Sequence, residues 1–243
     1  MVLAAITLLP LNVVQADDYS DLIKAAIDNP ARAEANSSRD EARMPDQVIK
    51  FMGVKPGDTV LDMVSNGGFY AEILAGVVGD DGRVIAHMFP GNGMDPDDAY
   101  SAKIRTAKHM QNVVPIYASF NSLDLKENTL DYVFLIQNFH DFHFDRFDVD
   151  LGRILSMYRK ALKPGGVMAI IDHQAVEGAP VSTGTTVHRI DASIVKSEMA
   201  AAGFKLEGEL DILKNNTDDL TKSVFDASVR GKTSRFILKF SNP

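Results

Sequence analysis

The stretch VLDMVSNGGFY at residues 60–70 decides the fold that we expect for this chain. It follows Pro56-Gly57 as an apolar run short enough for a buried strand, and the residues from Phe69 to Val78 have the apolar spacing of a helix. Glycines between a strand and a helix let a ligand approach the backbone, and the free N–H groups at the helix start face that ligand. We therefore expect a ligand pocket above this turn, with an ordinary tight connection as the alternative.

The composition indicates one domain with a small-molecule partner. A chain of 243 residues, 45% of them hydrophobic, is long enough for one sizeable core. Its net charge of -8, without any block rich in Lys and Arg, argues against nucleic acid or an anionic membrane surface as the main partner. The lack of cysteine excludes disulfides, thiolate metal ligands and a cysteine nucleophile.

The N-terminal residues 1–16 are typical of a cleaved signal peptide. Residues 2–14 are apolar apart from Thr7 and Asn12, and the small residue Ala16 precedes two acids. The usual positive start is missing, so a buried N-terminal helix of a cytoplasmic protein is the alternative. The segment is too short to span a bilayer as a mature helix. We expect a periplasmic or secreted protein, cleaved after Ala16, with no stable membrane insertion.

Apolar runs alternate with helical patterns along the rest of the chain. Strands are expected at 83–89, 113–117, 130–136, 167–171, 204–213 and 235–240. Helices are expected at 19–29, 97–109, 147–162, 190–202 and 219–229. Such alternation predicts right-handed crossovers and a parallel sheet covered on both faces. The sequence therefore predicts a single doubly wound α/β domain over 17–243, in which 17–52 form covering helices.

Residues 48–240 resemble the class I S-adenosylmethionine-dependent methyltransferases. Three features carry the resemblance: the strand and turn at 60–69, the strand after Leu130-Asp131-Tyr132-Val133, and Leu162-Lys163-Pro164-Gly165-Gly166 before a strand. More narrowly, the chain resembles an exported group of predicted methyltransferases through His140-Asp141, Asp172-His173, His188-Arg189-Ile190-Asp191 and Ser234-Arg235-Phe236. The resemblance implies a mostly parallel, seven-stranded, Rossmann-like sheet with an antiparallel last strand, and methyl transfer from S-adenosylmethionine to a small molecule.

The resemblance also implies a cofactor site around the opening stretch. Asp62 corresponds to the acid that ends the family's first strand, and Val64 and Asn66 stand at the first two of its three glycine positions. Met88 and Ser119 stand where the family has acids for the ribose hydroxyls and the adenine amino group. The cofactor-binding residues expected from this comparison are Asp62, Ser65, Asn66, Gly67, Gly68, Phe69, Met88 and Ser119.

Further polar residues follow the fourth and fifth expected strands, at the edge where ligands bind in open α/β sheets. A histidine beside an aspartate can act as a general base near neutral pH, and an arginine can neutralise a carboxylate or phosphate. We expect His140 or His173 as the base and Arg189 as the substrate clamp. The candidate catalytic residues are His140, Asp141, Asp172, His173, His188 and Arg189. The charged run at 39–45 is either a solvated helix face or a lid that places an arginine over the pocket.

Two other functions stay open beside methyl transfer. Histidines and carboxylates are ordinary metal ligands, so the same residues would suit an exported hydrolase or lyase that depends on histidine or a metal. No pair of residues has a strong metal spacing, such as two histidines four apart on a helix, and we therefore assign no metal site. The third possibility is a small-molecule-binding protein that reuses the methyltransferase fold.

Overall fold

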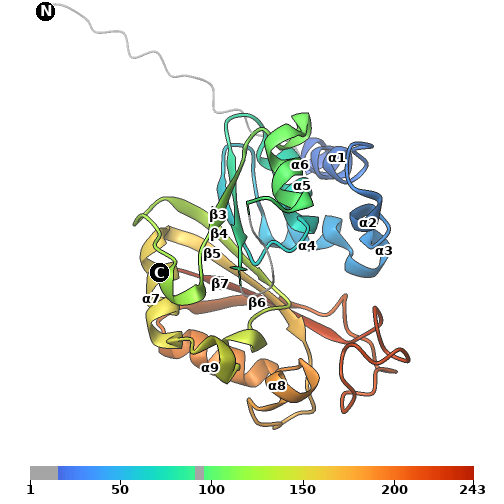
Figure 1. Cartoon of the computed structure of the whole chain (residues 1–243), viewed down its shortest axis with the longest axis vertical. Coiled ribbons are helices and arrows are strands. Elements are labelled where there is room, and N and C mark those ends of the chain that lie inside the picture. The colour runs from blue at the N-terminus through green and yellow to red at the C-terminus, as the bar shows by residue number, and fades with distance from the viewer. Residues whose placement is uncertain (1–15, 91–95) are drawn as a thin grey trace, which may run out of the picture.

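Seven strands form a single sheet in the order β3-β2-β1-β4-β5-β7-β6 (Figure 1). The structure is a computed structural model that describes residues 16–90 and 96–243, so the predicted signal peptide lies, except for Ala16, outside the described residues. The strands are β1 (Thr59–Met63), β2 (Arg83–Met88), β3 (Val113–Tyr117), β4 (Leu130–Ile136), β5 (Leu162–His173), β6 (Lys205–Leu210) and β7 (Arg235–Ser241). Strand β7 is antiparallel to both neighbours and the other pairs are parallel, which confirms the expected fold class.

Helices cover both faces of this sheet. Figure 1 shows α1, α5 and α6 on one side and α7 and α9 on the other. The helices are α1 (Ala16–Ile27), α2 (Glu34–Ser37), α3 (Asp40–Arg43), α4 (Pro45–Met52), α5 (Phe69–Val78), α6 (Ala99–Thr106), α7 (Leu151–Ala161), α8 (Thr183–Val187) and α9 (Ala192–Ala201). Among the described residues, no helix is both long enough and apolar enough to cross a membrane.

Alternate residues of the central strands pack into two separate cores. On β4, Tyr132 and Phe134 join the core beneath α1, α4 and α5, whereas Val133 and Leu135 join the core beneath α7 and α9. Side chains alternate between the two faces of a strand, so a strand buried on both faces must be apolar throughout. This constraint explains why β4 is apolar from Tyr132 to Ile136, whereas the partly buried Asp131 near its start pairs with Lys163.

The turn between β1 and α5 holds two residues other than glycine in the left-handed region. The φ angle is +50° at Val64 and +30° at Asn66. This region is costly for a side chain with a Cβ atom, and most costly for a β-branched one. The backbone N–H of Val64 donates to Nδ1 of the buried His87 at 3.3 Å, and His87 Nε2 donates to the Ala118 carbonyl at 2.9 Å. A neutral histidine therefore holds the strained turn in place.

The segment at 211–234, between β6 and β7, forms turns, so the prediction of a helix at 219–229 was wrong. Its side chains accept hydrogen bonds from backbone N–H groups two residues further on, in the pairs Asp219 with Thr221, Ser223 with Phe225 and Asp226 with Ser228. Such bonds offer the backbone an alternative to the helical pattern. The turns carry Phe225 to the wall of the cavity described below.

We predict that His87 makes stability depend on pH. Burial lowers its pKa from 6.5 to about 4, so between these values the unfolded chain binds a proton that the folded chain rejects. The free energy of unfolding should then fall by about 2 kcal/mol between pH 8 and pH 5 from this group. Urea unfolding of the wild type and His87→Gln at both pH values measures the difference, and an equal pH dependence in the two proteins would contradict the prediction.

Candidate functional site

A cavity of about 380 Å³ lies over the carboxyl ends of β1, β4 and β5. The β1–α5 turn forms one wall, and the segments after β4 and β5 form the opposite wall. The charged segment around α3 and the turns near Phe225 also contribute to its lining. Its volume is that of a small-molecule pocket, and its place is where open α/β sheets bind ligands.

Most of the residues predicted for the site meet at this cavity. From the opening stretch, the lining residues are Asp62, Ser65, Asn66 and Phe69. From the segments after β4 and β5, they are His140, Asp141, His173 and His188. Gly67 has open space where a Cβ atom would project, whereas Gly68 lies against the ring of Tyr100. Eight of the residues predicted from the sequence therefore line one cavity.

His140 is held by a fully buried carboxylate. It begins a 3₁₀ helix (His140–His143) after β4, and Asp172 lies near the end of the neighbouring strand β5. The Nδ1–H of His140 donates to Asp172 Oδ1 at 2.8 Å, and its backbone N–H donates to Oδ2 at 2.9 Å. Burial disfavours the charged ring, but the Asp172 carboxylate outweighs burial and raises the pKa of His140. Asp172 is thus a positioning residue behind the ring.

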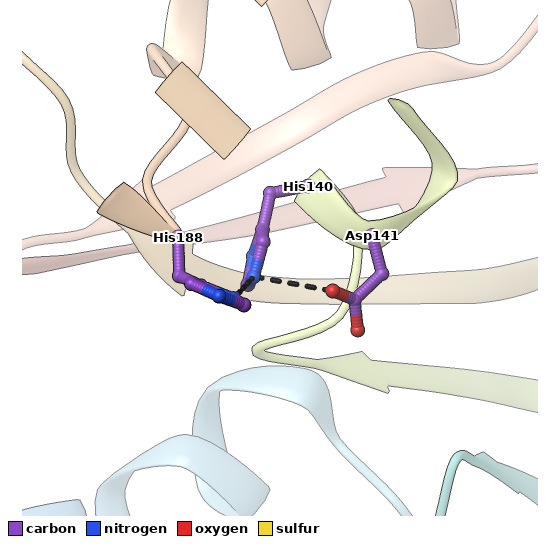
Figure 2. Close-up of side chains that lie close together, drawn as sticks. All are labelled: His140, Asp141 and His188. Carbon is purple, nitrogen blue, oxygen red and sulfur yellow. Dashed lines mark hydrogen bonds and ion pairs between the residues drawn. The ribbon is translucent and has the colours of Figure 1, made fainter. Parts of the chain in front are cut away.

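The other ring nitrogen of His140 points toward two further polar side chains (Figure 2). Its Nε2 atom lies 3.3 Å from His188 Nδ1 and 3.4 Å from Asp141 Oδ1. The second oxygen of Asp141 accepts a hydrogen bond from Asn138 at 2.8 Å. Burial lowers the pKa of His188 and raises the pKa of Asp141. Three polar side chains therefore converge on one wall of the cavity.

His140 is the better of the two candidate bases, because burial lowers the pKa of His173 whereas the Asp172 carboxylate raises that of His140. Its Nε2 accepts from the Gln137 amide at 3.1 Å, so its Nδ1–H donates to the Thr233 hydroxyl at 2.8 Å. Burial lowers the pKa of His173 to about 3, so the ring is neutral near neutral pH. A ring with so low a pKa, whose Nε2 lone pair accepts from Gln137, is a poor acceptor for a substrate proton.

Arg189 does not reach the cavity, so the prediction that it clamps the substrate was wrong. Its guanidinium is fully buried and forms two hydrogen bonds with Asp218, at 2.8 and 3.0 Å. It also donates to the carbonyl groups of Gln174 and Lys222. A buried arginine needs such partners because its charge cannot be left unpaired. Arg189 therefore fastens the turns of 211–234 to the end of β5.

Arginines of the charged segment line the cavity instead. Arg43 Nη2 donates to the Gln137 side chain at 3.1 Å, and Arg39 bonds Asn36 and a backbone carbonyl. The two guanidinium carbons lie 4.5 Å and 5.3 Å from the centre of the Phe69 ring. Neither forms an ion pair with a carboxylate in the described part of the chain. Burial lowers the pKa of Arg43 to about 10, and a partly buried, unpaired cation favours an anionic ligand.

The described residues fit the amino-acid end of S-adenosylmethionine better than its adenosine end. Burial raises the pKa of Asp62 to about 6. Its carboxylate accepts a hydrogen bond from the Ser65 hydroxyl at 2.6 Å. Gly67, in the same turn, has open space where a Cβ atom would project. Met88 is instead fully buried, and Ser119 caps a 3₁₀ helix; neither of them lines the cavity.

Aromatic rings fill the space at the ends of β2 and β3. The rings of Phe89 and Phe120 stack with 4.2 Å between their centres, and Phe147 packs edge-on against Phe89 at 5.0 Å. Phe89 and Phe120 are almost fully buried. The described residues at these two strand ends therefore offer no carboxylate to a ribose or an adenine, and the expectation that Met88 and Ser119 bind the cofactor does not match their positions.

Comparison with known proteins agrees with the fold. Residues 61–170 match the family model of a methyltransferase domain. A demethylmenaquinone methyltransferase of Bacillus mycoides is 27% identical over 129 residues, which are 52% of this chain and 49% of that protein. The match thus spans about half the length of this curated relative.

Solved structures cover nearly the whole chain. A methyltransferase from Aquifex aeolicus that depends on S-adenosylmethionine superposes with a TM-score of 0.61 at 23% identity, over 92% of this chain and 98% of that one. The cyclase SpnF superposes with a TM-score of 0.63 at 16% identity, over 96% and 95% of the two chains. Residues 61–170 thus match a methyltransferase domain, and the chain as a whole has the fold of the class I S-adenosylmethionine-dependent methyltransferases.

Proposed function

We propose that this protein is a methyltransferase that acts on an anionic small molecule and uses S-adenosylmethionine as the methyl donor. The methyltransferase domain match supports the reaction class. The observation that carries the substrate class is the placement of unpaired Arg39 and Arg43 on the same cavity as the His140–Asp172 pair. When bound, S-adenosylmethionine would supply an electrophilic methyl group.

The two arginines and Phe69 would bind the anionic part of the substrate. A guanidinium presents several N–H donors in one plane, which suits a carboxylate or a phosphate. Among the described residues, Arg43 has only the neutral Gln137 side chain as a hydrogen-bond partner, so an incoming anion would not have to displace a carboxylate there. The cavity thus has a cationic wall that needs a negatively charged ligand.

The His140–Asp172 pair would prepare the nucleophile on the opposite wall. Donation of Nδ1–H to Asp172 leaves a lone pair on Nε2, which accepts from His188 Nδ1 at 3.3 Å on the cavity wall, and a substrate would displace that hydrogen bond. An oxygen or nitrogen held there can give up its proton to Nε2 as it attacks a methyl group. Beyond this, the protein has to align the two reactants, which the opposed walls would do.

A second candidate is an enzyme of another class, or a binding protein, that reuses this fold. The aromatic rings at the ends of β2 and β3 favour it, because they occupy the region that the family uses for adenosine. A fold does not fix the chemistry of its site.

The N-terminal pattern further supports our proposal of a periplasmic or secreted protein, where a small molecule would be the partner.

Calorimetric titration with S-adenosylmethionine and its demethylated product tests the leading proposal. We expect binding with a dissociation constant below 1 mM, weakened at least tenfold in Asp62→Asn, because a neutral amide binds a cationic ammonium less well (about 1.4 kcal/mol per tenfold). Asp80→Asn, in an exposed turn, serves as the matched control and should bind like the wild type. Absence of heat at near-millimolar cofactor in the folded protein would refute the proposal and leave the second candidate.

Removal of Arg43 should affect ligand binding more than folding. In the described part of the chain, Arg43 pairs with Gln137 and with no carboxylate. We therefore expect Arg43→Met to change the free energy of unfolding by less than about 1 kcal/mol. Arg32→Met is the control, since Arg32 pairs with Asp40 through two hydrogen bonds and its loss should cost about 2 kcal/mol or more.

Phosphate provides the matching readout for binding. Inorganic phosphate at tens of millimolar should raise the melting temperature of the wild type and of Arg32→Met more than that of Arg43→Met. A large loss of stability in Arg43→Met with an unchanged phosphate response would show that Arg43 serves the fold instead of a ligand.

A further inference from the structure

We propose that His140, Asp141 and His188 form a binding site for a divalent transition-metal ion, with Zn²⁺ as the first ion to test. One atom from each side chain points toward the same space on the cavity wall (Figure 2). These three atoms all lie within 4.8 Å of one another. The proposal departs from the sequence analysis, which assigned no metal, and it does not depend on methyl transfer.

The spacing of the donor atoms is the first argument. Nitrogen and oxygen ligands at about 2.0–2.2 Å from a tetrahedral zinc ion lie about 3.3–3.5 Å from one another. His140 Nε2 lies 3.3 Å from His188 Nδ1 and 3.4 Å from Asp141 Oδ1. Two of the three edges of a ligand triangle therefore already have the length that such an ion requires.

The hydrogen bonds behind the ligands are the second argument. Metal-bound histidines usually donate their other ring N–H to a carboxylate, which fixes the tautomer and orients the ring. His140 does so toward the fully buried Asp172, at 2.8 Å. Ligating carboxylates are in turn hydrogen-bonded, and Asp141 accepts from Asn138 at 2.8 Å. Two of the three proposed ligands thus have the supporting partners that metal sites have.

The surroundings of the cluster are the third argument. The ring of Phe144 packs edge-on against His188 at 5.2 Å and lies 5.7 Å from His140, while Phe225 covers His188 at 4.7 Å between ring centres. Apolar side chains around a metal limit the access of water. Three protein ligands would leave at least one coordination position open, as in catalytic sites, and all three residues line the cavity.

The donor set also selects among metals. Two imidazoles and one carboxylate suit Zn²⁺, Fe²⁺, Co²⁺ or Ni²⁺, whereas Mg²⁺ and Ca²⁺ prefer oxygen ligands. With the ion bound, Nε2 of His140 would be a ligand and could not accept a substrate proton. A substrate hydroxyl group bound to the ion would instead lose its proton to solvent more readily, because the metal charge lowers its pKa. The ion would thus take over the activation of the nucleophile.

Metal titration of the untagged chain, after removal of bound metal by a chelator, tests the proposal without substrate or S-adenosylmethionine. We expect one equivalent of Zn²⁺ or Co²⁺ to bind with a dissociation constant of 10 µM or lower. The visible spectrum of the Co²⁺ form should show the intense bands of four- or five-coordination. His188→Gln and Asp141→Asn should each weaken binding at least tenfold.

Two further variants separate a built site from incidental binding. Asp172→Asn keeps all three ligands but removes the carboxylate behind His140, and it should weaken binding 10- to 100-fold. His143→Gln is the matched control, because His143 belongs to the same 3₁₀ helix but faces Glu198 at 3.2 Å, and it should bind like the wild type. Circular dichroism checks that each variant is folded.

Two results would overturn the proposal. One is the absence of stoichiometric binding by the folded wild type at 100 µM Zn²⁺ and Co²⁺. The other is equal affinity in the wild type and His188→Gln, which would place the bound ion elsewhere on the chain. His188 is only partly buried, so its substitution should leave the fold intact even if Asp172→Asn does not. Failure of the S-adenosylmethionine titration would not affect either outcome.

Discussion

The hydrogen bond between His140 and the buried Asp172 is the interaction on which the candidate site depends. It joins the end of β5 to the segment that follows β4, and it fixes which ring nitrogen of His140 faces the cavity. A buried carboxylate needs such partners, so its burial and the tautomer of the histidine support each other. Every chemical role proposed for this wall, as a proton acceptor or as a metal ligand, uses the Nε2 atom of His140, which lies 3.3 Å from His188 Nδ1.

The pocket of this protein occupies only part of the carboxyl edge of its sheet. Over β1, β4 and β5 the edge is hollow and polar, whereas at β2 and β3 it carries the stacked rings of Phe89 and Phe120. The same seven strands can support either arrangement, because the side chains at the strand ends do not contribute to the sheet hydrogen bonds. Fold and ligand are therefore specified by different residues.

Local strain and unpaired charge both lie beside the cavity. Val64 has a positive φ angle in the β1–α5 turn, and Arg39 and Arg43 are partly buried without a carboxylate partner. Each of these features costs stability, and each persists because the surrounding structure holds it, as neutral His87 does for the turn. Features that weaken the folded state concentrate at sites that serve a ligand, which agrees with the place of the cavity.

The sequence by itself determined the strands and the longer helices, though not the turns at 219–229, since the period of apolar residues is a local property. The helix Phe69–Val78 and the strand Leu130–Ile136 have the bounds that the pattern predicts, and the antiparallel last strand follows the family resemblance. Only the tertiary structure decided the partners of the charged groups. It buried Arg189 against Asp218 and brought His188 to His140 across 48 residues of sequence. Such contacts depend on how distant segments pack, and no pattern within one segment encodes them.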